Sequence, residues 1–120
     1  MSARVLELLL ADARTPSGGY AHSGGLEGLV WEGGDDVPAF MRARLRTVGH
    51  VDASFAAAAS RTNSIERLLD LDSEWAARTP AEPLRRAARA LGRGLLRTAR
   101  VWFPDVDLLG AYAEASALSP

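Results

Sequence analysis

The chain has 120 residues, a formal net charge of −1 and 48% hydrophobic residues, which is enough for one domain with a modest core. It contains no cysteine, and each of its 14 basic residues is an arginine. These absences exclude disulfides, thiolate metal sites, cysteine nucleophiles, Walker-type phosphate lysines and Schiff-base lysines. With so small a net charge, nothing steers the whole chain toward nucleic acid or an anionic membrane.

Frequent alanine and leucine favour an all-α fold, and no segment shows the two-residue alternation of a strand. The apolar run at residues 5–10 predicts a short helix that stops near Asp12. This run is too short for a signal peptide or a membrane span, so we expect a soluble, cytoplasmic protein. A second helix is expected to begin at Ser23 or Gly24 and to end at the glycine pair 33–34.

Three further helix starts are marked by capping patterns. The acidic pair 35–36, followed by Pro38, predicts a third helix. Asp52 is expected to cap a short alanine-rich helix after it. The segment Asn63–Glu66 has the spacing of a capping residue followed by an acid in the first turn, and predicts the next helix.

The clearest local signal is Thr79–Glu82, a capping box with proline at the first helical position. It predicts a long helix that ends before Pro104, after which Asp105 or Asp107 begins a last helix. One stripe of the long helix is apolar, and a second stripe consists of five arginines: Arg86, Arg89, Arg93, Arg97 and Arg100. The whole chain is therefore expected to form a single-domain helical array of about six to seven helices.

The glycine-rich segment 15–27, TPSGGYAHSGGLE, lies between the first two helices. It lacks the Gly-x-Ser-x-Gly arrangement of a hydrolase elbow, because Ala21 stands two residues before Ser23. Two of its glycines have the spacing of a phosphate-binding loop, but the lysine and the hydroxyl residue that must follow are missing. The chain holds only two histidines, His22 and His50, so a metal site would depend on carboxylates.

Several interpretations of these features stay open. The glycines can provide turns while Ser23 caps the helix, or Tyr20 and His22 can form a rigid recognition surface. A small hydrolase that uses Ser23 and His22 is a further hypothesis. The arginine stripe is either solvated or partner-facing, and the alternative function is a helical nucleic-acid-binding module that uses residues 86–100.

Two segments resemble the urease accessory protein UreF family. The first is residues 6–33, LELLLADARTPSGGYAHSGGLEGLVWEG, and the second is residues 76–99, AARTPAEPLRRAARALGRGLLRTA. Pro83 departs from the family's usual start of the long helix. Because UreF-like chains are commonly longer, residues 1–120 are interpreted as one UreF-like domain that lacks the family's C-terminal portion.

The resemblance implies that the protein is not an enzyme, has no cofactor and holds no metal itself. It implies an all-helical, dimeric scaffold that joins UreD (also called UreH) to the nickel-carrying GTPase UreG on the urease apoprotein, and that modulates GTP hydrolysis during nickel insertion. Neither nucleic acid nor a membrane is an expected partner. The positions that match the family's motifs are the candidate partner contacts: Gly18, Gly19, Tyr20, His22, Ser23, Leu26, Glu27 and Arg85.

Overall fold

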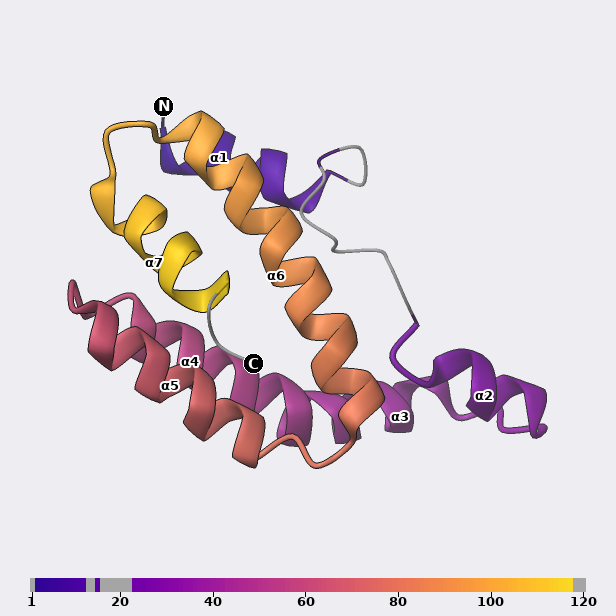
Figure 1. Cartoon of the computed structure of the whole chain (residues 1–120). Coiled ribbons are helices and arrows are strands. Elements are labelled where there is room, and N and C mark those ends of the chain that lie inside the picture. The colour runs from indigo at the N-terminus through magenta and orange to yellow at the C-terminus, as the bar shows by residue number, and fades with distance from the viewer. Residues whose placement is uncertain (1, 13–14, 16–22, 118–120) are drawn as a thin grey trace.

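The computed structural model describes residues 2–12, 15 and 23–117, which contain seven α-helices, one π-helical turn and no β-strand (Figure 1). The elements are α1 (Ala3–Ala11), α2 (Leu26–Trp31), α3 (Val37–Arg44), η1 (Leu45–Gly49), α4 (His50–Ala59), α5 (Ile65–Ala77), α6 (Glu82–Trp102) and α7 (Asp107–Ala117). The predicted all-α fold is confirmed. Within these ranges, no helix is both long and apolar enough to cross a membrane.

Helices α4 to α7 form the main body of the molecule. Helix α4 packs against α5, and α7 packs against both α5 and α6. Their apolar faces surround a cavity of about 500 Å³, to which Phe55, Leu68, Leu95 and Leu108 contribute. Leu71 is 6% exposed and is the one buried residue among those that the structure describes.

The molecule as a whole is extended. The molecule measures 49 × 32 × 22 Å and has a radius of gyration of 15.8 Å. A compact domain of this length has a radius of gyration of about 14 Å. Helix α2 lies at one end, beyond α3 and away from α4 to α7 (Figure 1). The partner-binding candidates on α2 therefore lie outside the main body.

The segments α3, η1 and α4 are one continuous helical rod. Asp36 caps its start by accepting a 2.8 Å hydrogen bond from the backbone N–H of Ala39, as predicted. Arg44 and His50, on either side of the π-helical turn, both keep right-handed helical dihedrals. The predicted separate helix capped by Asp52 is therefore wrong, because nothing interrupts the backbone before that residue. The carboxylate of Asp52 instead accepts a 2.8 Å hydrogen bond from the indole N–H of Trp75 on α5.

The predicted capping box at Thr79–Glu82 is also wrong. Helix α6 begins at Glu82 with Ala81 as its N-cap, and the Thr79 hydroxyl donates to the carbonyl of Trp75 at 3.2 Å. A helix that began at residue 80 would place Pro83 where the first intrahelical N–H bond is made, and proline has no N–H. The later start places Pro83 in the first turn, where the N–H has no helical partner and its loss costs little.

Helix α5 is capped by Ser64, one residue later than the predicted Asn63. Its Oγ accepts from the N–H of Arg67 at 3.2 Å and donates to Oε2 of Glu66 at 2.7 Å. Two hydrogen bonds hold the pKa of Glu66 below its ordinary value of 4.5. The larger effect comes from the Ser64 hydroxyl, and the smaller one comes from a backbone N–H. The start of α5 is thus stabilised by a cap that bonds both the backbone and an acidic side chain.

We expect Ser64→Ala to lower the free energy of unfolding by about 1 kcal/mol, because the N–H of Arg67 loses its partner. Urea unfolding followed by circular dichroism measures this change. The matched control is Ser73→Ala within the same helix, where Ser73 bonds only the carbonyl of Leu69 and its loss should be nearly neutral. An equal loss in both variants would show that the cap contributes nothing.

The same cap predicts a pH dependence. Because the pKa of folded Glu66 is lowered, its stabilising contribution is present above the ordinary pKa of 4.5 and is lost as the pH falls below it. The difference in stability between the wild type and Ser64→Ala should therefore shrink in that acidic range.

Candidate partner-binding surface

The end of the glycine-rich segment enters α2 through a turn that a serine hydroxyl stabilises. Gly18, Gly19, Tyr20 and His22 lie outside the described residues, whereas Ser23 and all that follows up to residue 117 are described. The Ser23 Oγ accepts a 3.3 Å hydrogen bond from the backbone N–H of Glu27. Ser23 therefore bonds the first turn of α2, but the prediction that Ser23 is the N-cap is wrong, because Gly25 holds that position and provides no side-chain cap.

Helix α2 begins at Leu26, later than the predicted start at Ser23 or Gly24. The reason is the backbone of two glycines, because Gly24 has φ of 64° and Gly25 has φ of 103°. Left-handed residues cannot continue a right-handed helix, and side chains other than hydrogen make the conformation of Gly25 costly. The glycines thus set the angle at which α2 leaves the segment before it.

Arg44 of α3 fixes this turn to the rod. Its Nη1 donates a 2.6 Å hydrogen bond to the carbonyl of Gly24, and its guanidinium lies 5.9 Å from the centre of the Phe40 ring. A Cβ atom on Gly24 would lie 2.8 Å from the same guanidinium, so a larger residue there would displace the Arg44 side chain. Sequence reasoning missed Arg44, since nothing in the sequence distinguishes it from the neighbouring Arg42 and Arg46.

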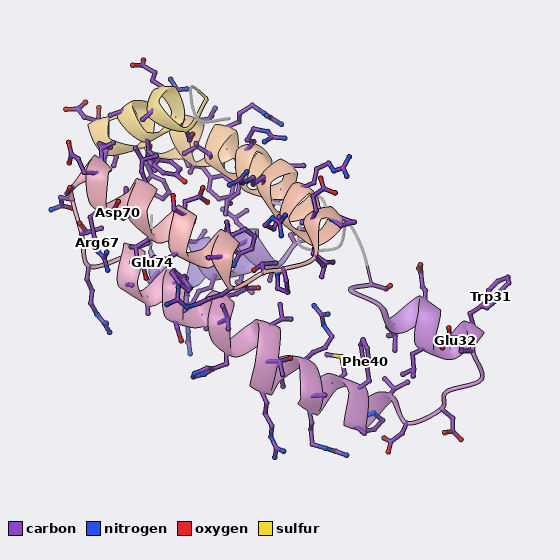
Figure 2. All side chains as sticks on the ribbon, turned by 60° about the horizontal axis from the view of Figure 1, so that its bottom comes forward. Trp31, Glu32, Phe40, Arg67, Asp70 and Glu74 are labelled. Atoms are coloured by element: carbon purple, nitrogen blue, oxygen red, sulfur yellow. The ribbon has the colours of Figure 1, made fainter. Side chains whose placement is uncertain are left out.

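The outer side of α2 exposes an aromatic ring beside an acid. Glu27 is exposed, Leu26 is half-buried, and Trp31 is 92% exposed, one helical turn after Glu27. Figure 2 shows the Trp31 side chain pointing away from the helices. Exposed tryptophan is rare on monomer surfaces and common among the residues that dominate protein interfaces. Sequence reasoning placed this position within the second expected helix and gave it no role.

Comparisons with known proteins give the family. The family model for UreF matches residues 31–119, which is most of the chain. This chain belongs to the UreF family. It is 44% identical over 110 residues to the urease accessory protein UreF of Mycobacterium tuberculosis strain H37Rv, in a match covering 88% of this chain and 51% of that protein.

Two other relatives give the same result. UreF of Mycobacterium marinum is 40% identical over 117 residues, covering 92% of this chain and 54% of the relative. UreF of Mycolicibacterium vanbaalenii is 42% identical over 112 residues, covering 89% of this chain and 52% of the relative. The chain thus spans about half the length of the curated UreF proteins that it matches. No solved structure matches it significantly.

In this UreF-family chain, the last candidate contact, Arg85, lies in the first turn of α6. Its Nη1 donates to the carbonyl of Thr79 at 2.6 Å and to that of Pro80 at 2.7 Å. Both bonds hold the backbone of its own chain, and neither joins Arg85 to residues 23–27. The structure therefore unites Ser23, Leu26 and Glu27 at α2 and places Arg85 on a different segment.

Residues that could do chemistry are sparse in this UreF-family chain. No group of three or more His, Cys, Asp or Glu side chains gathers within residues 2–12, 15 and 23–117 in a way that could hold a metal ion. His50, the second histidine, is exposed at the start of α4. In contrast to these residues, α2 and the turn before it combine fixed backbone with an exposed aromatic ring, which is an arrangement suited to binding protein.

Proposed function

We propose that this chain acts in urease maturation as a non-catalytic scaffold subunit. It joins a UreD/UreH-like protein to a UreG-like, nickel-carrying GTPase on the urease apoprotein and modulates GTP hydrolysis as nickel is inserted. It works in the cytoplasm, as a homodimer within the complex and as a single helical domain. The observation that carries this proposal is membership of the UreF family, to which the matched residues 31–119 belong.

The surface proposed for the GTPase consists of the glycine-rich segment and α2. It includes the family-matched positions Gly18, Gly19, Tyr20, His22, Ser23, Leu26 and Glu27, and adds Trp31. The fixed turn supports this role, because Arg44 orders the Gly24 backbone before any partner binds. A surface ordered in advance loses less conformational entropy on binding. Arg85 is better suited to holding the start of α6 than to direct contact.

Co-expression tests the scaffold function. The 120-residue chain is produced with a UreD-like and a UreG-like protein and analysed by size-exclusion chromatography with mass determination. We expect a stable complex that contains all three. If the chain elutes alone while a full-length UreF relative forms the complex under the same conditions, the scaffold function does not reside in this chain.

We expect the double variant Tyr20→Ala, His22→Ala to weaken binding to the UreG-like GTPase by about tenfold or more, as truncation of interface aromatic rings commonly does. Titration calorimetry with the purified GTPase measures the change. The matched control is His50→Ala, which removes the exposed histidine of α4 and should leave the affinity unchanged. Equal affinities for the wild type and the double variant would remove the segment from the interface.

A further inference from the structure

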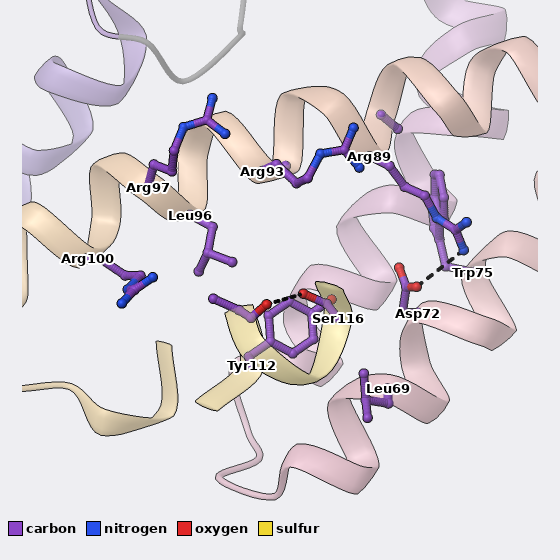
Figure 3. A pocket seen from close by; sticks show the side chains of 13 residues that line it. Leu69, Asp72, Trp75, Arg89, Arg93, Leu96, Arg97, Arg100, Tyr112 and Ser116 are labelled. Atoms are coloured by element: carbon purple, nitrogen blue, oxygen red, sulfur yellow. Dashed lines mark hydrogen bonds and ion pairs between the residues drawn. The ribbon is translucent and has the colours of Figure 1, made fainter. Parts of the chain in front are cut away.

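A row of arginines borders a groove between α6, α5 and α7. The groove has a volume of about 550 Å³, and Figure 3 shows the row along one wall. We call it the arginine groove. Its cationic wall consists of Arg89, Arg93, Arg97 and Arg100. The remaining stripe residue, Arg86, forms a 2.6 Å ion pair with Glu82 on its own helix and is not part of this wall.

Most of this positive charge is not neutralised within the described residues. Arg89 lies 3.5 Å from a carboxylate oxygen of Asp72, across the groove on α5. Arg93, Arg97 and Arg100 form no ion pair with any residue that the structure describes. Three guanidinium groups on one face repel one another, and an anion between them would relieve that repulsion. The positive charge of the groove therefore favours the binding of a negatively charged ligand.

The row is longer than one anion requires. From position 89 to position 100 an α-helix rises by about 16 Å. A second hollow continues the path past Arg97 and Arg100, toward Val106 just before α7. A free phosphate or carboxylate would contact only one or two of these side chains. The length of the row favours a ligand with several acidic groups in line.

The opposite wall is largely apolar. It includes Leu69 and Trp75 of α5 and Tyr112 of α7. Burial is the main cause that raises the pKa of Tyr112, and the nearby Asp72 carboxylate raises it further. The guanidinium of Arg89 opposes this shift. The Tyr112 hydroxyl thus stays protonated at neutral pH and can donate a hydrogen bond. A ligand that fills the groove needs an apolar side as well as an acidic side.

Neutral and basic ligands do not meet these conditions. A nucleic-acid duplex could reach the exposed Arg93, Arg97 and Arg100, but its phosphates would leave the apolar wall of the groove without a partner. The arginines recur at intervals of four, four and three residues, which is the repeat of one helix face. Acidic residues at the same intervals on a second helix would lie opposite them, and guanidinium groups bind carboxylates in a bidentate manner. We infer that the arginine groove binds an amphipathic helix of a partner protein that carries aspartate or glutamate along one side.

This inference goes beyond the proposed function, because it concerns a second surface and names the chemistry of its partner. A synthetic peptide tests it in the absence of any urease protein. The peptide has about 16 residues to match the row, glutamates at i, i+4, i+8 and i+11, leucines on the adjoining side and a fluorescent label. The control peptide has the same composition with the glutamates distributed around the helix. Fluorescence anisotropy with the whole chain at low salt gives both affinities.

We expect the peptide with aligned glutamates to bind about tenfold more tightly than the control peptide, with an affinity that falls as salt is added. The triple variant Arg93→Gln, Arg97→Gln, Arg100→Gln should lose most of this difference. The charge-matched variant Arg42→Gln, Arg46→Gln, Arg61→Gln changes exposed arginines outside the groove and should keep it. Circular dichroism checks that both variants retain their helix content.

Ser116→Glu provides an independent variant that leaves every arginine in place. Ser116 lines the groove from α7, so a carboxylate there competes with the peptide. Ser73→Glu, on the exposed side of α5, is its control. The inference is overturned if both peptides bind equally, or if the groove variants and their controls lose affinity equally. It is also overturned if a DNA or RNA oligonucleotide binds more tightly than the peptide through the same arginines.

Discussion

Replacing Leu71 with alanine is expected to lower the free energy of unfolding by about 2 kcal/mol or more, within the range known for buried leucines. Leu71 is 6% exposed and faces the cavity between α4, α5, α6 and α7. No second residue among the described ones is buried to this extent. Because whole domains are stable by only about 5–15 kcal/mol, this single change removes a large fraction of the total.

Urea unfolding followed by far-UV circular dichroism measures the effect of Leu71→Ala. Leu84→Ala is the matched control, because Leu84 is the same residue type on α6 but is 43% exposed. We expect the control to lose less than half as much stability as the Leu71 variant. If the two losses are equal, the four helices do not share the single core that the structure shows.

Replacing Trp31 with alanine is expected to leave the stability of the chain unchanged and to weaken its binding to the UreG-like GTPase. The side chain is 92% exposed, so the folded chain loses almost no buried surface. A tryptophan at the centre of an interface commonly contributes 2 kcal/mol or more, which is roughly a thirtyfold change in affinity. Calorimetric titration and thermal unfolding of the same preparation measure the two effects separately.

Val101→Ala is the control for Trp31, because Val101 is a second strongly exposed apolar residue, at 78%, on α6. Its removal should change neither stability nor affinity for the GTPase. An unchanged affinity in the Trp31 variant would place α2 outside the interface. A loss of stability in that variant would show that Trp31 packs against the chain in solution.

The fold could be predicted from the sequence wherever one local signal decided the outcome. Asp36 and Pro38 marked the start of α3 correctly, because a capping carboxylate and an early proline act within one turn. Asp52 and Thr79 led to wrong predictions of helix starts, because residue types that cap helices can make other hydrogen bonds instead. Asp52 receives the indole N–H of Trp75, and Thr79 bonds back to the end of α5.

The candidate site could be predicted only in part, for a related reason. Its family motif made Ser23, Leu26 and Glu27 the candidates, and the bond from the Ser23 hydroxyl to the first turn of α2 follows from local backbone chemistry. Arg44 could not be found, since its bond to Gly24 joins residues 20 positions apart. The exposure of Trp31 was equally hidden, because an apolar residue in a helix is normally expected to face a core.

The π-helical turn η1 determines the direction in which the proposed GTPase-binding surface faces. Each residue of an α-helix advances the helix by about 100°, and the wider π turn accommodates extra chain without ending the rod. Removing one residue from Leu45–Gly49 would therefore rotate Arg44, and the Gly24 turn bound to it, around the rod relative to α5. The direction in which Trp31 points around the rod therefore depends on η1, some fifteen residues further along the chain. The glycine-rich segment alone does not determine it.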